Sequence, residues 1–185
     1  MKVLIACEFS GKVRDAFIRK GHEALSCDII NTDVDGPHYK GDVRDILYDG
    51  WDLMIAHPPC TRLCNSGVRW LHERGLWEEL KQATDFFRLL WDAPIDKIAI
   101  ENPTPHKYAI NRIGDYSQSI QPWQFGHGET KRTCLWLKNL PPLMPTNIVS
   151  GRDNRIHFAP DSKGRAKLRS ETYQGIADAM AEQWG

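Results

Sequence analysis

The amino-acid sequence predicts an α/β protein with a doubly wound, mostly parallel sheet. Short apolar runs typical of buried strands alternate with segments whose apolar residues recur at helical spacing. Polar or turn-forming residues follow these apolar runs, as they do where parallel strands end at a ligand-binding edge. With 185 residues, the chain is expected to form one domain over residues 1–185.

The expected elements follow one another along the chain. A buried strand is expected at residues 3–7, after which a turn at 8–11 leads into a helix that ends near Gly21. Further strands are expected at 24–27, 39–45, 52–56, 97–100 and 133–137. Amphipathic helices are expected at 73–92 and 170–184. Their inward-facing residues are Leu76, Leu80, Ala83, Phe86, Phe87 and Leu90 in the first, and Ile176, Ala177, Met180 and Ala181 in the second.

The composition excludes several classes of protein. Equal numbers of basic and acidic residues, 24 of each, argue against a histone-like coat for nucleic acid. A chain that is 26% charged and 10% aromatic is not typical of disorder. No apolar run reaches the ~18 residues of a membrane helix, and Glu8 stands too early for a signal peptide. Five cysteines without disulfide-like spacing favour a reducing, cytoplasmic compartment.

Basic residues gather in the last third of the chain. Between residues 121 and 170 there are nine Lys and Arg residues but only three acidic ones. Within this window, residues 138–165 contain four prolines and two glycines with little periodicity, which predicts a long irregular basic loop. Such a loop indicates an anionic partner such as a phosphate backbone; the alternative is an ordinary solvated surface. The candidate contacts include Arg165, Lys167 and Arg169.

Acidic residues stand at or near the ends of the first three expected strands. Glu8 follows the first strand, Asp28 the second, and Asp42 lies in the third region. Carboxylates at this edge of a sheet accept hydrogen bonds from ribose hydroxyls and from an adenine amine. Because the chain has no G-x-G-x-x-G motif, a nucleoside without a pyrophosphate fits better than a dinucleotide. The alternative is that these are ordinary turn residues, since Asp is common in turns.

Pro58-Pro59-Cys60 is the clearest local candidate for catalysis. Two prolines fix the backbone at a strand end, where a following turn would offer its amide groups to a Cys60 thiolate. An inert buried cysteine is the alternative, as expected for Cys7, Cys27 and Cys134 in apolar runs. Cys60 and Cys64 also form one loose C-x₃-C pair, but structural zinc sites favour two clean pairs, so no metal site is predicted.

Glu101 directly follows the next apolar run, as the first residue of Glu101-Asn102-Pro103. Burial at the mouth of the sheet is expected to raise the pKa of this carboxyl, which would suit proton donation. A cysteine nucleophile with a nearby glutamate indicates covalent attack coupled to proton transfer. The alternative is that Glu101 is a helix cap or turn residue.

Seven short motifs follow one another in an order that resembles a known family. They are Phe9-Ser10-Gly11, Asp28-Ile29, Gly41-Asp42-Val43-Arg44-Asp45-Ile46, the stretch from Asp52 to Pro58-Pro59-Cys60, Glu101-Asn102-Pro103, Lys131-Arg132-Thr133-Cys134-Leu135-Trp136 and Gly175-Ile176-Ala177. In this order they resemble the DNA (cytosine-5) methyltransferases, and in particular the small phage- or prophage-type members. The resemblance covers residues 1–137, with a weaker match over 165–185.

This resemblance implies a Rossmann-like, S-adenosylmethionine-dependent methyltransferase fold, with C5 of a cytosine in DNA as methyl acceptor. It implies that Cys60 is the nucleophile, that Glu101 holds or protonates N3 of the base, and that Arg132 contacts the target base. Lys131 is implied as a further nucleic-acid contact. The implied cofactor-binding residues are Phe9, Ser10, Gly11, Asp28, Ile29, Asp42, Val43 and Pro59.

The sequence also departs from the pattern of this family. Thr61 stands where Gln commonly follows the nucleophile, and Pro103 replaces a Val. Only residues 138–165 occupy the interval where the family places a target-recognition domain. The resemblance therefore implies the chemistry but not sequence-specific duplex recognition, so single-stranded or loosely paired DNA, a homodimer or a partner protein are expected. Two alternatives stay open: C5 modification of a free pyrimidine nucleotide, and a non-catalytic nucleic-acid-binding relative.

Overall fold

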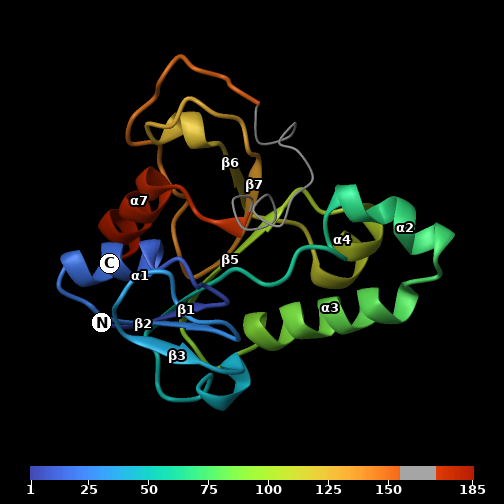
Figure 1. The fold of residues 1–185 in the computed structure, drawn as a ribbon, viewed down its shortest axis with the longest axis horizontal. Coiled ribbons are helices and arrows are strands. Elements are labelled where there is room, and N and C mark those ends of the chain that lie inside the picture. Colours follow the sequence, from blue (N-terminus) through green and yellow to red (C-terminus); the bar gives the residue numbers. More distant parts are fainter. Residues whose placement is uncertain (155–169) are drawn as a thin grey trace.

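The computed structural model describes residues 1–154 and 170–185, and its centre is a seven-stranded sheet (Figure 1). Along the sheet the strands stand in the order β3-β2-β1-β4-β5-β7-β6. Their bounds are β1 Lys2–Ala6, β2 Glu23–Asp28, β3 His38–Lys40, β4 Leu53–Ala56, β5 Lys97–Pro103, β6 Gln118–Ile120 and β7 Thr133–Lys138.

The sheet is mostly parallel, as the sequence predicts. Strands β1 to β5 pair in parallel, whereas β7 runs antiparallel to both β5 and β6. Strand β1 pairs with β2 on one side and with β4 on the other, so the chain order reverses between β1 and β4. In open α/β sheets, ligands bind beyond the carboxyl ends of the strands at this reversal. The fold therefore predicts a ligand-binding site at the carboxyl ends of β1 and β4.

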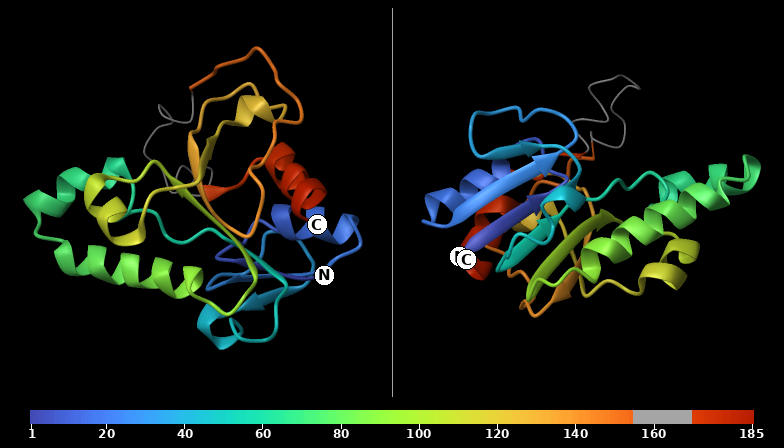
Figure 2. Two further views of the ribbon diagram at one scale, coloured as in Figure 1. Left: turned by 180° about the vertical axis from the view of Figure 1, so that it is seen from behind. Right: turned by 90° about the horizontal axis from the view of Figure 1, so that it is seen from below.

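Helices cover both faces of the sheet (Figure 2). Helices α1 (Lys12–Arg19) and α7 (Gln174–Trp184) lie side by side on one face. Helix α3 (Trp77–Trp91) covers the other face, next to the shorter α2 (Val68–Glu73) and α4 (Lys107–Ile113). Short 3₁₀ turns are formed by Val43–Asp45, Asn65–Gly67 and Pro122–Gln124. None of the helices among the described residues has the length and apolar character needed to cross a membrane.

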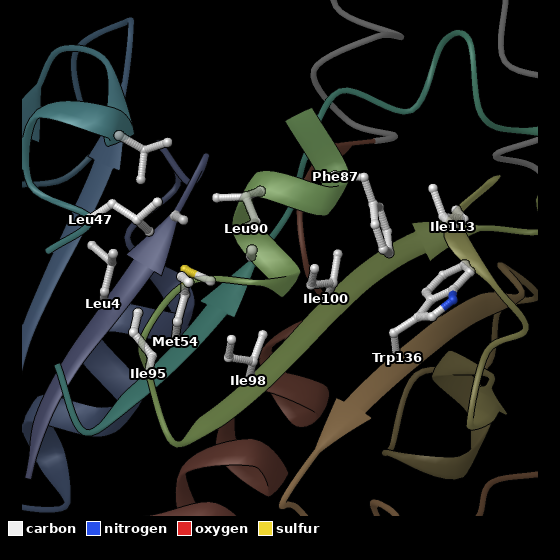
Figure 3. Packing of buried hydrophobic residues seen from close by; sticks show 14 of the residues in the cluster. Leu4, Leu47, Met54, Phe87, Leu90, Ile95, Ile98, Ile100, Ile113 and Trp136 are labelled. Atoms are coloured by element: carbon white, nitrogen blue, oxygen red, sulfur yellow. The ribbon is translucent and has the colours of Figure 1, made fainter. Parts of the chain in front are cut away.

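The alternation of side chains along the strands builds two buried layers. Leu4, Met54 and Ile98 point to the α3 face, where they pack with Phe87 and Leu90 (Figure 3). Their neighbours along the strands point to the opposite face and pack against α1 and α7. In α7 the four residues expected to face inward are all buried: Ile176, Ala177, Met180 and Ala181.

Several element boundaries differ from those expected. The region 73–92 is not one helix: α2 ends at Glu73 and α3 starts at Trp77, because Gly75 between them adopts a φ of 64°. The expected third strand is shorter, and Val43–Asp45 form a 3₁₀ turn instead. Strand β6 and helix α4, of three and seven residues, are too short to give a clear period. Residues 139–154 contain no helix or strand, whereas Lys138, the first residue of the predicted loop, ends β7, and residues 155–165 lie outside the described residues.

A fully buried arginine fastens the loop after β2 to helix α1. Arg14, in α1, has no exposed surface, and its guanidinium reaches side chains and carbonyl groups of that loop. Its hydrogen-bond partners include Ser26 Oγ (3.3 Å), Thr32 Oγ1 (3.3 Å), Val34 O (3.3 Å) and Asp35 O (3.2 Å). At Gly11, which has a φ of 74°, an added Cβ would lie 2.5 Å from Val34 and 2.6 Å from Arg14. Only glycine fits where this loop meets α1.

Candidate active site

The strand register brings three residues to the same level at the carboxyl edge of the sheet. Ala6 pairs with Ala56, and Ala56 pairs with Ile100. The next residues of these neighbouring strands are Cys7, His57 and Glu101, and the backbone N–H of His57 still donates to Ala6 O at 2.9 Å. The sequence-predicted Glu101 therefore lies beside a histidine that the sequence analysis did not single out.

His57 and Glu101 form a buried pair. His57 Nδ1 lies 3.0 Å from Glu101 Oε2, and their side chains are only 10% and 12% exposed. Thr172, just before α7, donates from its hydroxyl to the same Glu101 oxygen at 3.3 Å. The C-terminal segment thus closes over the end of β5.

The predicted pKa direction for Glu101 is wrong. Burial does raise the pKa of this carboxyl, but the hydrogen bond and positive charge of His57 lower it more, helped by the charge of Lys131. The pKa of Glu101 is lowered to about 2, so the carboxylate is ionised. For His57, burial lowers the pKa, yet the hydrogen bond and charge of Glu101, with the charge of Glu8, raise it overall. The proton of the hydrogen bond between them therefore sits on His57 Nδ1.

Glu8 turns inward at the end of β1. Cys7 adopts a φ of 58°, which is uncommon for a residue with a side chain and marks a strained turn. After this turn, Glu8 Oε1 accepts hydrogen bonds from Ser10 Oγ (2.7 Å) and from the N–H of Val13 (3.3 Å). Ser10 is therefore engaged with Glu8, while the neighbouring Phe9 is only partly buried.

The loop that carries Cys60 is fastened to the loop that follows Glu101. The N–H of Asn65 donates to Thr104 O at 3.0 Å, and the N–H of His106 donates to Leu63 O at 3.0 Å. The Nδ1 of His106 accepts from Ala109 N, so its Nε2 carries the proton and donates to Arg62 O at 2.8 Å. These bonds hold the loop of Cys60 beside the end of β5.

Two thiols, Cys60 and Cys64, interact in this loop. The amides of Leu63 and Cys64 bond to Cys60 O rather than to its sulfur. The thiol of Cys60 instead donates a hydrogen bond to the sulfur of Cys64. Burial raises the pKa of Cys64, but this hydrogen bond, the Ser66 hydroxyl and the amides of Ser66 and Gly67 lower it more, to about 5. The amide groups expected to stabilise a Cys60 thiolate therefore act on Cys64.

The residues expected to hold a nucleoside lie along the same edge, beyond β2 and β3. Asp28 ends β2, where Oδ1 accepts from Ile30 N at 3.2 Å, and the next side chain, Ile29, is 76% exposed. Asp42 is exposed and accepts from Arg44 N at 3.0 Å, whereas Val43 is buried, so its backbone rather than its side chain faces outward. Carboxylates beside an open apolar side chain suit the ribose and flat base of S-adenosylmethionine. Pro59, next to Cys60, is also exposed.

The two adjacent basic residues before β7 have different surroundings. Lys131 donates from Nζ to Glu171 O at 2.9 Å and acts electrostatically on Glu101. Arg132 is exposed, and its guanidinium lies 2.9 Å from the hydroxyl of Tyr116. The structure therefore places Lys131, not Arg132, in the electrostatic environment of the carboxylate. Arg165, Lys167 and Arg169 lie outside the described residues.

For some residues of this site the sequence predicts no role. The only signal for His57 is its place directly before Pro58, and no residue pattern distinguishes Thr172. Cys64 was noticed only for its spacing from Cys60. Within residues 1–154 and 170–185, no group of three His, Cys, Asp or Glu side chains is arranged to hold a metal ion.

Comparisons with known proteins agree on the fold. No family model and no curated protein sequence matches the chain. Among solved structures, it is similar to an E. coli protein described as a DNA modification methyltransferase encoded within a prophage, with 16% identity and a TM-score of 0.52. It is also similar to the Entamoeba histolytica methyltransferase EhMeth, with 14% identity and a TM-score of 0.52. The matches cover 80% of this chain, but only 52% and 57% of those two. At these identities the likeness establishes a shared Rossmann-like fold.

Proposed function

We propose that this chain transfers a methyl group from S-adenosylmethionine to C5 of cytosine in DNA through a covalent adduct with Cys60. The observation that carries the proposal is the joining of two loops, one with a cysteine after β4 and one with a buried carboxylate after β5, at the ligand-binding edge. A nucleophile and a proton-holding group on neighbouring strand ends are what addition to a pyrimidine ring requires.

The side chains divide the work on the ring. C5 of cytosine is a poor nucleophile until a group adds to C6. Cys60 passes its proton to the neighbouring Cys64 sulfur and adds to C6 as a thiolate, while a proton delivered through Glu101 to N3 neutralises the negative charge that develops there. Asp28 and Asp42 would hold S-adenosylmethionine, which would supply the electrophilic methyl group. Solvent water then takes the C5 proton, the electrons left on C5 expel the Cys60 thiolate, and Cys64 returns the proton to Cys60.

The proposed acceptor is DNA without strong sequence choice. A base in a duplex has to leave the stack to reach such a site, at a cost of a few kcal/mol. Residues 139–154 form no recognition module, so bases already unpaired are the favoured substrates. A second copy of the chain or a partner protein is proposed where duplex DNA is modified.

Tritium transfer from labelled S-adenosylmethionine tests the proposal directly. Duplex DNA, single-stranded DNA, RNA and dCMP are assayed in parallel with the wild type. We expect label in DNA, with single strands modified at least tenfold faster than a duplex, because flipping costs a few kcal/mol. Label in dCMP alone would make a free nucleotide the substrate, and no label in any acceptor would favour a non-catalytic relative.

A second prediction concerns backbone contacts by the basic segment. Replacing Arg165, Lys167 and Arg169 by alanine should weaken DNA binding equally for all sequences, because phosphate contacts carry no sequence information. It should also reduce the slope of log K against log salt by about 2, as expected for three lost contacts. The matched control replaces Arg19, Lys20 and Lys81, which lie on the surface in α1, just after it and in α3. Equal affinity and slope in both triple variants would contradict the prediction.

A further inference from the structure

His57 occupies an unusual position for a histidine. It lies at the switch point of the sheet, with its side chain nine-tenths buried, and it faces carboxylates from two neighbouring strands. Glu101 receives the hydrogen bond of Nδ1 at 3.0 Å. Glu8, from the end of β1, contributes its negative charge. Burial of a histidine cation costs solvation free energy, and the two neighbouring carboxylates offset that cost.

Two atoms of this cluster lack a partner among the described residues. They are His57 Nε2 and Glu8 Oε2, and both are buried. Buried polar atoms in folded proteins nearly always have partners, and exceptions are frequent at catalytic sites. Glu8 follows Cys7, whose φ of 58° marks a strained turn at the end of β1. Both features indicate a functional arrangement rather than a structural ion pair.

We propose that His57 is a positioning residue that stores the proton which Glu101 delivers to N3 of the pyrimidine, with Glu8 stabilising the stored charge. This inference rests on the proposed function and deepens it. At rest, His57 is an imidazolium and Glu101 a carboxylate. When the Cys60 thiolate adds to C6, the proton passes from His57 Nδ1 to the Glu101 carboxylate and from that carboxyl group to N3. The imidazole is left neutral, and Glu101 is again ionised. When the Cys60 thiolate leaves C6, N3 returns its proton through Glu101 to His57.

The charges around His57 set the pKa of its imidazole and therefore the pH range in which it can supply a proton. Glu101 and Glu8 raise the pKa of His57, whereas burial and the charge of Lys131 lower it, and the net shift is upward from 6.5. The imidazolium therefore persists to a higher pH than that of an ordinary histidine and is lost as the pH rises through this raised value. The rate of methyl transfer should fall on the alkaline side with the same midpoint.

The first test replaces His57 by asparagine, which can still donate a hydrogen bond to Glu101 but cannot carry a proton. We expect kcat at pH 8 to fall about 100-fold, with the alkaline limb of the pH profile moved to lower pH. Binding of S-adenosylhomocysteine should stay within about twofold of the wild type, which shows that the variant is folded. The control is His22→Asn, a histidine at the opposite edge of the sheet, whose profile should match the wild type. An unchanged kcat and pH profile in His57→Asn would overturn the proposal.

The second test does not depend on activity. The His57 imidazole is titrated by NMR in the wild type, in Glu8→Gln and in Glu101→Gln. The proposal requires a midpoint above 6.5 that falls in both variants, and most in Glu101→Gln. A midpoint below 6.5 in the wild type, or no change in either variant, would refute it. If the titration is as expected but no acceptor is methylated, the proton pair stands and the proposed function fails.

Discussion

Replacing Cys60 by serine should abolish the covalent complex with DNA that contains 5-fluorocytosine and lower methyl transfer by about 1,000-fold or more. Fluorine cannot leave C5 as the proton does, so an enzyme that adds a thiolate to C6 stays attached to the base. A serine hydroxyl is too weak a nucleophile to form this adduct at neutral pH. The complex is measured as a band resistant to denaturation on a gel, and transfer by the tritium assay.

Cys64→Ser is the matched control for this experiment. It removes the sulfur that takes the Cys60 proton but keeps a hydroxyl at the same place in the turn. We expect the complex to form more slowly, with its pH optimum moved upward, because the Cys60 thiol then loses its nearest proton acceptor. Trapping that survives in Cys60→Ser and disappears in Cys64→Ser would make Cys64 the nucleophile. Such an outcome would accord with the low pKa of Cys64.

Asp28→Ala should weaken the binding of S-adenosylmethionine by about 100-fold, the effect of losing one or two charge-assisted hydrogen bonds to ribose hydroxyls. Calorimetry with the cofactor and with S-adenosylhomocysteine measures both affinities, which should fall together because the nucleoside is common to them. Asp35→Ala is the control, since this exposed residue lies in the same loop and binds Arg14 through its backbone carbonyl. Equal losses in the two variants would mean that the loop, not the Asp28 carboxylate, matters for binding.

The sequence predicts the sheet better than it predicts the ends of its elements. Strand β4 and the middle of strand β5 are recognisable because Leu53–Ala56 and residues 98–100 are continuously apolar, as buried parallel strands require. Strand β6 has three residues and no period, and its existence depends on β7, which is next to it in space. Whether a short edge strand such as β6 forms depends on the strand it pairs with rather than on its local sequence.

The same distinction applies to the site. Cys60 and Glu101 were predicted because each follows an apolar run, a local pattern. The ionisation of Glu101 was not predicted from the sequence. Its main partner, His57, stands 44 positions earlier in the chain, and the two side chains meet only through the pairing of β4 with β5. Burial alone predicts a raised pKa, and a charge supplied by a neighbouring strand reverses the direction. Long-range pairing of this kind has no trace in local residue patterns.

The hydrogen bond from Thr172 to Glu101 has a consequence for biosynthesis. Residues from β1, β4 and β5 leave the ribosome well before residue 172, yet the surroundings of Glu101 are incomplete until that threonine arrives with α7. The nascent chain can therefore pair its central strands early while its carboxylate still faces water. The hydrogen bond to Glu101 therefore forms late in translation. A product terminated before residue 172 that still folds its sheet would lack this bond.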